Sequence, residues 1–527
     1  MRRLSPFVHR IRVSRQVRRS SRSSVCSLKL HEVLVEMNAG RLSSVEITQA
    51  CIDQMRQNRH LNATISEIST EIALQQARSA DARRKQGLPP RRLDGIPVIV
   101  KDNYAVEQMP MTCASNMLRD FAPSYTATVV RRWLDEGAIL LGKANMDEFG
   151  TGNAGSRSFL GPSLNPWRRK DLPGEPVPGG SSGGSVAAVA ANMCYGSLGS
   201  DTGGSVRLPA SYCGIVGYQP SYGRASRFGL VPLASSLDCP SVFARSVQDA
   251  ALLGDVMCGH DPLDATSVRG PRLDTLAAFA SVDLDADYPL EGVRIGIPQE
   301  LYVEELSDDG RRLWMKAADW LQDAGAEVVP VSLPSIPLAV ACYETVCSGE
   351  AFSNMSKFSG LTFGGQPLVA DASSTAFAHC REQLLGKHMR DRITFGSFVL
   401  SERGDDSGKF FTLAAKARRL IYDDFNKVLR KDKGVDVLLC LSSIGQAFYA
   451  GTDREKESSD GVSLMLTPTN LAGATGISIP CGLSSSDKLP IGLQVMGRRF
   501  GDEIIFRVSR VLEAKAGFTY FRSQELN

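Results

Sequence analysis

Short apolar runs alternate with longer stretches of helical periodicity through most of this 527-residue chain, and this alternation limits the folds open to it. Each apolar run is short enough for one buried strand. The runs occupy residues 95–100, 293–298, 326–333, 435–441, 477–482 and 491–497, and the helical patterns occupy 32–58, 66–87, 309–324, 409–430 and 502–515. Strands that alternate with helices predict an α/β fold, in which helices cover a β-sheet.

The first thirty residues differ in composition from the rest of the chain. They contain eight Arg, one Lys and no acidic residue, and apolar residues are interleaved with the arginines. This composition is typical of an organelle-targeting presequence, and it lacks the unbroken apolar core of a secretory signal. The alternative interpretation is a basic tail that contacts nucleic acid. We predict a mitochondrial presequence over residues 1–30, with an approximate end, and a single domain over residues 31–520.

The composition of the remaining chain excludes several classes of protein. The whole chain has a net charge of +3, but residues 31–527 alone have a net charge of −6, which does not fit a basic nucleic-acid binder. No stretch of about 18 apolar residues exists, so we expect no membrane span. The twelve cysteines form no C-x-x-C pair, and we interpret them as free thiols packed like small apolar residues. Without a Cys/His cluster or a carboxylate-rich loop, we expect no metal site.

Two motifs match known sites only in part. "GAILLGKA" (137–144) has the glycines and lysine of a phosphate-binding loop, but Ala144 stands where Ser or Thr would hold magnesium. "GSSGG" (180–184) matches a nucleophile elbow centred on Ser182, but the proline-rich segment before it cannot form the required strand. We therefore predict no ATP site at the first motif and a bystander serine at the second. The adjacent acids of "MDEF" (146–149) are typical of a solvated surface or a helix cap.

A serine nucleophile needs a base, and no motif in this chain recommends a histidine for that role. A lysine can serve if burial lowers its pKa enough to leave a neutral amine. Lys101 follows the apolar run 95–100 directly and fits this need, although an ion pair with Asp102 explains it equally well. In "DTGGS" (201–205), two glycines precede Ser205 and allow backbone N–H groups to converge on an oxyanion. The alternative for this stretch is an ordinary glycine-rich turn.

Taken together, these stretches resemble the amidase-signature family. The resembling stretches are "DGIPVIVKDN" (94–103), "GGSSGGSVAAVAA" (179–191) and the segment 199–238. The resemblance implies one amidase domain over residues 31–520, built on a large mixed β-sheet with helices on both faces. It also implies that Lys101 is the base, that Ser181 relays the proton after a cis peptide bond, and that Ser205 forms the acyl-enzyme. The implied oxyanion donors are the amides of Thr202, Gly203 and Gly204.

Within the family, later stretches of the chain are most similar to the A subunits of tRNA-dependent amidotransferases. These stretches are 112–118, 142–167, 221–238, 348–358 and 470–482. The resemblance implies that the chain hydrolyses glutamine and passes ammonia to a partner, where glutamyl-tRNA(Gln) is activated by ATP and converted to glutaminyl-tRNA(Gln). It implies subunits B and C as partners, ATP and Mg at the partner subunit, no cofactor in this chain, and a location in the mitochondrial matrix.

The residues expected to bind glutamine depart in part from the family pattern. The resemblance assigns Arg392 to the α-carboxylate, which a guanidinium binds in bidentate fashion, and Tyr343 to the wall of the pocket. The family has an aspartate seven residues before Asn470, where this chain has Ser463; Asp460 is our candidate replacement.

This departure keeps two alternative functions open. The first is a free-standing amidase of the same family that acts on another amide. The second is a non-catalytic assembly subunit that keeps the fold, although the presence of Lys101, Ser181 and Ser205 argues against it.

Overall fold

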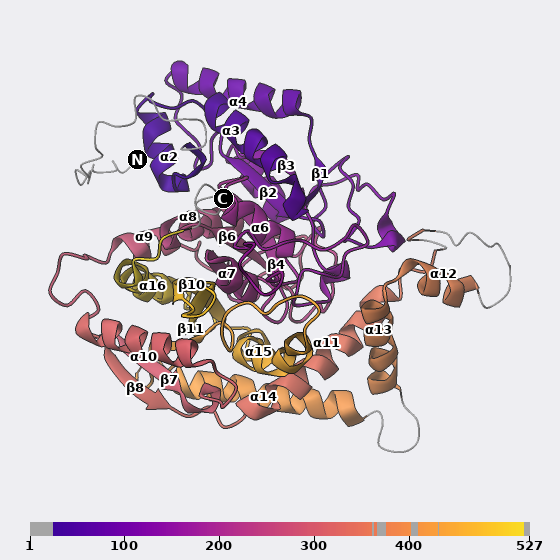
Figure 1. The fold of residues 1–527 in the computed structure, drawn as a ribbon, viewed down its shortest axis with the longest axis vertical. Coiled ribbons are helices and arrows are strands. Elements are labelled where there is room, and N and C mark those ends of the chain that lie inside the picture. Colours follow the sequence, from indigo (N-terminus) through magenta and orange to yellow (C-terminus); the bar gives the residue numbers. More distant parts are fainter. Residues whose placement is uncertain (1–24, 361–362, 366–375, 402–408, 431, 521–527) are drawn as a thin grey trace.

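The computed structural model describes residues 25–360, 363–365, 376–401, 409–430 and 432–520, and its centre is one mixed sheet of eleven strands (Figure 1). The strand order is β1-β3-β2-β4-β6-β5-β10-β11-β9-β7-β8. The strands are β1 (Thr64–Glu67), β2 (Pro97–Lys101), β3 (Ile139–Ala144), β4 (Gly196–Asp201), β5 (Val216–Gln219), β6 (Cys239–Ala244), β7 (Arg294–Pro298), β8 (Glu327–Val331), β9 (Val437–Leu441), β10 (Thr475–Leu483) and β11 (Pro490–Gly497). Each apolar run predicted as a strand is one in the structure.

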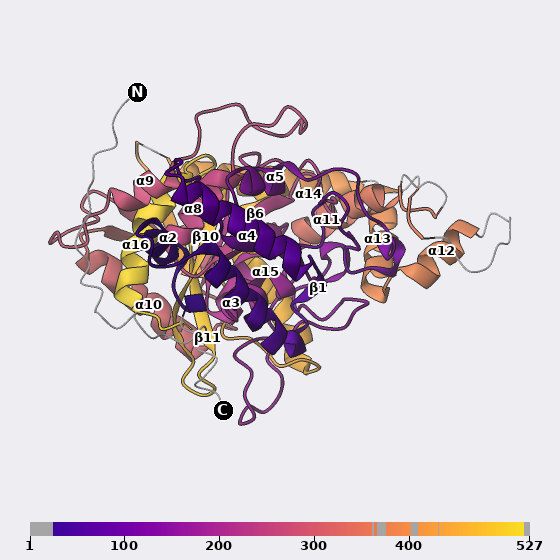
Figure 2. The same ribbon diagram turned by 90° about the horizontal axis from the view of Figure 1, so that it is seen from above.

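The helices of the described chain connect these strands. They are α2 (Leu30–Asn38), α3 (Ser44–Gln57), α4 (Thr70–Lys85), α5 (Thr128–Asp135), α6 (Gly183–Ala190), α7 (Arg207–Cys213), α8 (Val247–Met257), α9 (Thr275–Ala280), α10 (Asp308–Asp323), α11 (Ala339–Met355), α12 (Ala376–Leu384), α13 (Lys387–Leu400), α14 (Lys409–Val428), α15 (Asp453–Leu471) and α16 (Asp502–Ala516). Figures 1 and 2 both show α12 and α13 projecting from the body beyond α11.

Helices cover both faces of the sheet, as the sequence predicts. On β5, a Cβ added to Gly217 would lie 2.6 Å from the side chain of Ala210 on α7. The next residue, Tyr218, packs edge-on against Phe506 of α16 with a centroid distance of 4.8 Å. Successive residues of a strand point to opposite faces, so α7 and α16 lie on opposite sides of the sheet. Strands enclosed in this way can be apolar on both faces, which explains the unbroken apolar runs of strands such as β9, Val437–Leu441.

Two parallel strand pairs set the position of the candidate site. β2 pairs in parallel with both β3 and β4, and Val100 is aligned with Leu198 of β4. The carboxyl ends of β2 and β4 therefore meet at one edge of the sheet. This edge brings Lys101, the last residue of β2, beside Ser200 near the end of β4.

The motif at residues 137–144, which resembles a phosphate-binding loop in part, is mostly a strand. Residues 139–144 form β3, and the ammonium group of the buried Lys143 lies 3.0 Å from the carboxylate of Asp102. Asp102 also accepts hydrogen bonds from the N–H and the hydroxyl of Thr112. Lys143 thus serves as a buried ion-pair partner, and Asp102 pairs with it rather than with Lys101.

The end of the predicted presequence belongs to the packed body. Residues 1–24 lie outside the described residues, but Cys26 is only 1% exposed and belongs to the core. The guanidinium of Arg245 donates to the carbonyl of Leu28 at 2.6 Å, and the hydroxyl of Tyr195 donates to the carbonyl of Val25 at 3.1 Å. The folded domain therefore includes residues 25–30, which the sequence analysis placed in the presequence.

The cysteines fit the interpretation made from the sequence. All twelve are free and buried, so they pack as small apolar side chains. In the described part of the chain, no helix combines the length and the apolar character needed to cross a bilayer.

Candidate active site

Lys101 is the centre of a buried cluster of serine hydroxyl groups. Its side chain is fully buried, and its Nζ lies 2.8 Å from Oγ of Ser181, 2.8 Å from Oγ of Ser182 and 2.9 Å from Oγ of Ser200. The lysine and the first serine of the S-S pair are therefore in direct contact, as the family resemblance implies. Ser182 contacts the amine at the same distance as Ser181, so its part as a bystander in the chemistry stays a prediction.

The environment of Lys101 gives its amine the properties of a base. Burial lowers the pKa of Lys101 to about 7, against the opposing attraction of the buried carboxylates of Asp147, Asp201 and Asp238. Since a buried ammonium loses its hydration, the neutral amine is favoured there. A neutral amine can accept a proton from a neighbouring hydroxyl group, so this lowered pKa suits a base near neutral pH.

Asp147 supports the backbone that presents Ser181. The Gly180–Ser181 peptide bond is cis, and the N–H of Asp147 donates to the carbonyl of Ser181 at 3.0 Å. The Asp147 carboxylate accepts from the N–H groups of Gly155 and Arg157 at 3.1 and 2.8 Å. A Cβ on Gly180 would overlap this carboxylate, so only glycine fits there. The acids of "MDEF" are buried rather than solvated, and Asp147 is the N-cap residue of the short 3-10 helix Glu148–Gly150, which fits the second of the two expectations.

Ser205 lines a small cavity of about 90 Å³ beside this cluster. It lies in the loop between β4 and α7 and is 8% exposed. Gly180, which precedes Ser181, lines the same cavity. Ser181, which contacts Lys101, thus directly follows a residue of the cavity that contains Ser205.

The loop that carries Ser205 is held by Asp201. The Asp201 carboxylate accepts from the N–H groups of Gly204 and Val206 at 2.7 and 3.0 Å, and it forms a fully buried ion pair with Arg207 at 3.1 Å. The Gly204 amide is therefore already engaged, and the structure removes it from the predicted oxyanion donors. Within the described chain, the amides of Thr202, Gly203 and Ser205 have no acceptor and stay available.

The predicted glutamine-binding residues Tyr343 and Arg392 line the same cavity as Ser205. Tyr343 comes from α11 and Arg392 from α13. The ring of Tyr343 packs directly on the backbone of Gly203, where an added Cβ would lie 2.5 Å from two ring carbons. The contact explains why a glycine stands at this position and fixes the ring next to the loop that carries Ser205.

Asp460 is not part of this cavity. It is an exposed residue of α15, whereas Ser463, one turn further along the same helix, lines the cavity. The sequence analysis proposed Asp460 as the replacement for the family aspartate, but the segment is helical and Asp460 does not line the cavity. The structure therefore separates Asp460 from Ser205, Tyr343 and Arg392.

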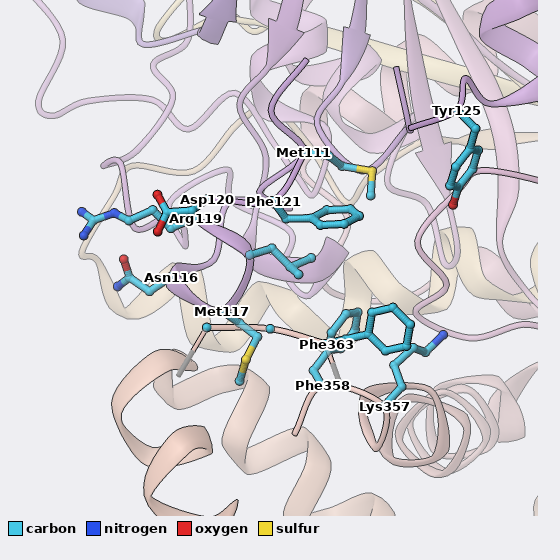
Figure 3. Close-up of a pocket in the computed structure, with 13 residues that line it drawn as sticks. Met111, Asn116, Met117, Arg119, Asp120, Phe121, Tyr125, Lys357, Phe358 and Phe363 are labelled. Atoms are coloured by element: carbon cyan, nitrogen blue, oxygen red, sulfur yellow. The ribbon is translucent and has the colours of Figure 1, made fainter. Parts of the chain in front are cut away.

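A larger cavity, of about 630 Å³, lies elsewhere in the fold (Figure 3). Figure 3 shows Met111, Phe121 and Tyr125 on one side and Phe358 and Phe363 on the other. None of the serines near Lys101 lines it. Its described lining combines apolar side chains with polar and charged ones and contains no serine, so it differs in chemistry from the cavity of Ser205.

The chain belongs to the amidase family, whose sequence model covers residues 46–506. The chain is 40% identical over 516 residues to the A subunit of the mitochondrial glutamyl-tRNA(Gln) amidotransferase of the rat; the match covers 94% of this chain and 95% of the rat protein. The human protein of the same name is 39% identical over 517 residues, with the same coverage of both chains.

Solved structures give the same relationship. The A subunit of the glutamyl-tRNA(Gln) amidotransferase from Thermotoga maritima is 34% identical, with a TM-score of 0.75, over 95% of this chain and 98% of that chain. A peptide amidase from Stenotrophomonas maltophilia is 27% identical, with a TM-score of 0.79, over 96% of this chain and 100% of that chain. The α/β architecture predicted from the sequence is thus the architecture of this family.

Proposed function

We propose that this chain is the glutamine-hydrolysing subunit of a tRNA-dependent amidotransferase that converts glutamyl-tRNA(Gln) to glutaminyl-tRNA(Gln). The observation that carries the proposal is the placement of Ser205 in one cavity with Tyr343 and Arg392, next to the buried Lys101–Ser181 pair. A nucleophile with a base supplies the hydrolysis, and a guanidinium in the same cavity suits the carboxylate of an amino acid. The chain's likeness to the A subunits of glutamyl-tRNA(Gln) amidotransferases supports the choice of glutamine.

The first half of the reaction forms an acyl-enzyme. The hydroxyl oxygen of Ser205 attacks the side-chain carboxamide carbon of glutamine while its proton passes to Oγ of Ser181. Ser181 releases its own proton to the neutral amine of Lys101, from which it is 2.8 Å away. The resulting oxyanion accepts hydrogen bonds from the free amides of the 202–205 loop, each donor contributing on the order of 3 kcal/mol to the stability of the transition state.

The second half releases both products. The Lys101 ammonium returns a proton through Ser181 to the leaving nitrogen, and the C–N bond breaks to give ammonia and a γ-glutamyl ester of Ser205. Water then attacks the ester carbon, with the same lysine and serine accepting its proton. Glutamate leaves and the Ser205 hydroxyl is restored, so the enzyme is ready for another cycle.

The proposal includes a division of labour with other subunits. Ammonia passes to a partner, which we identify with the B subunit of a complex that also contains a C subunit. ATP, Mg and the glutamyl-tRNA(Gln) bind at the partner, and this chain carries no cofactor. Its body has a net charge of −6 beyond residue 30, which agrees with contact to tRNA through the partner. The arginine-rich start and the mitochondrial relatives support a location in the mitochondrial matrix.

A second candidate, a free-standing amidase, is favoured by the neutral Ser463 in the cavity wall. The test measures ammonia release from glutamine by the chain alone and by the chain coexpressed with the partner subunits, with glutamyl-tRNA and ATP. We expect glutamine turnover that Ser205→Ala abolishes without loss of the fold. Strong hydrolysis of other amides without tRNA, and none of glutamine, would establish the free-standing amidase instead.

A further inference from the structure

The carboxylate of Glu344 forms an ion pair with Arg392 in the wall of the cavity that contains Ser205. Glu344 follows Tyr343 on α11 and lines the cavity with Ser205. Its Oε2 lies 3.1 Å from Nη2 of Arg392. We infer that Glu344 binds the α-ammonium group and determines the specificity for an amino-acid amide, an inference that rests on the proposed glutamine hydrolysis.

The chemistry of an α-amino acid requires two opposite charges side by side. Its carboxylate and its ammonium group are attached to the same carbon atom, so their partners must also be neighbours. Arg392 and Glu344 form such a pair in the cavity wall. A charge-assisted hydrogen bond to each substrate group is the strong kind of contact that orients a small polar molecule.

The carboxylate of Glu344 is partly exposed and can accept a hydrogen bond from a ligand. The nearby buried aspartates do not line the cavity. Its side chain is 43% exposed, compared with 17% for Arg392. Asp147 and Asp201 accept hydrogen bonds from backbone amides of their own loops, and neither faces the cavity. Among the described residues of the lining, Glu344 is the one carboxylate.

The other charged side chains of the lining are positive, so this carboxylate determines whether the cavity suits a ligand with an ammonium group. Arg157 and Arg392 both line the cavity, so without Glu344 the wall would have two guanidinium groups and no negative charge. Such a wall prefers an anionic amide to a zwitterionic one. Ser463, in the position where the family has an aspartate, is a neutral hydroxyl in the same wall. Glu344 thus supplies, from α11, the negative charge that the described residues of α15 do not bring to the cavity wall.

Binding measurements test the inference independently of turnover. The full chain with Ser205→Ala is titrated calorimetrically with glutamine and with glutaric acid monoamide, which has the same carboxylate and amide but no amino group. We expect Glu344→Gln to weaken glutamine binding roughly 10- to 100-fold and to leave or improve binding of the monoamide. Adding Ser463→Asp to Glu344→Gln should restore glutamine binding. Asp391→Asn removes an exposed negative charge beside Arg392 and should change neither affinity.

Three outcomes would overturn the inference. In the first, Glu344→Gln weakens the binding of both ligands equally, which indicates that Glu344 only positions Arg392. In the second, Glu344→Gln leaves glutamine binding unchanged. In the third, the chain with Ser205→Ala alone does not bind glutamine. Failure of the proposed function looks different. There, glutamine binds with the expected dependence on Glu344, but the chain with Ser205 intact and its partners present does not release ammonia from it.

Discussion

The amine nitrogen of Lys101 lies 2.8 Å from the hydroxyl oxygen of Ser181, and both groups are buried. A lysine in water would be protonated at neutral pH and would only donate to this hydroxyl. Burial lowers the pKa of Lys101 to about 7, so the same contact can transfer a proton in either direction. This contact is the physical basis of the proposed hydrolysis.

The pH dependence of turnover follows from this pKa. Because the neutral amine is the active form, kcat/KM for glutamine should rise about tenfold per pH unit below pH 7 and level off above it. Lys101→Ala should lose roughly 10²- to 10⁴-fold at every pH. Steady-state rates from pH 5 to pH 9 check both expectations; recovery of wild-type rates by Lys101→Ala at high pH would argue against a lysine base.

The stability of the protein should report the same shift. The pKa of Lys101 in the folded state, about 7, is below its value of about 10.4 in the unfolded chain. Between these values the unfolded chain binds one more proton, so the free energy of unfolding should rise with pH by about 1.4 kcal/mol per unit. Lys101→Met removes this contribution. Urea unfolding of both proteins at several pH values should therefore show that the wild type gains stability relative to Lys101→Met from pH 7 to pH 10. A stability difference between the two proteins that does not change with pH would contradict the lowered pKa.

The two serines that contact Lys101 should differ in their effect on turnover. Ser181→Ala removes the hydroxyl between the amine and the cavity, and we expect a loss of kcat of roughly 10²- to 10⁴-fold. Ser182→Ala leaves that path in place and removes only one neighbour of the amine, so its loss should be much smaller. Single-turnover rates of the two variants, with thermal melting as a control for folding, make the comparison. A larger loss in Ser182→Ala would assign the relay to the second serine.

The contact between Gly203 and Tyr343 predicts a coupled pair of variants. In Gly203→Ala the new methyl group would lie 2.5 Å from the ring of Tyr343, so the ring must move, at a cost of about 1–3 kcal/mol. The same substitution in a Tyr343→Ala background has space and should cost less. A double-mutant cycle on the free energy of unfolding measures this coupling. An equal cost in both backgrounds would show that the ring does not restrict position 203.

The strands that are apolar runs can be predicted from the sequence, but a strand such as β4, Gly196–Asp201, has no apolar run and was not predicted. The arrangement of the strands could not be predicted either. A strand such as β2 is enclosed on both faces and is therefore one apolar run, 97–100, that ends in Lys101. The strand order depends on pairings between distant segments, such as β5 with β10, and no local pattern encodes them.

The missed site residues have a common physical reason. Asp147 and Glu344 are charged residues in unremarkable sequence surroundings, and only the fold reveals that the first is buried and that the second borders the cavity. The engaged amide of Gly204 depends on the side-chain conformation of Asp201, which the glycine pattern does not specify. An aspartate a few residues before a helix is a signal for such capping, and "SDTGGSVR" contains it.

The most direct test of the account is to identify the residue that carries the acyl group. The protein is mixed with isotope-labelled glutamine, quenched in acid during turnover and digested, and the peptides are analysed by mass spectrometry. We predict a γ-glutamyl ester on Ser205 that is absent from Ser205→Ala and does not accumulate in Lys101→Ala. A label on Ser182 or another residue, or normal glutamine turnover by Ser205→Ala, would contradict the assignment of Ser205 as the nucleophile.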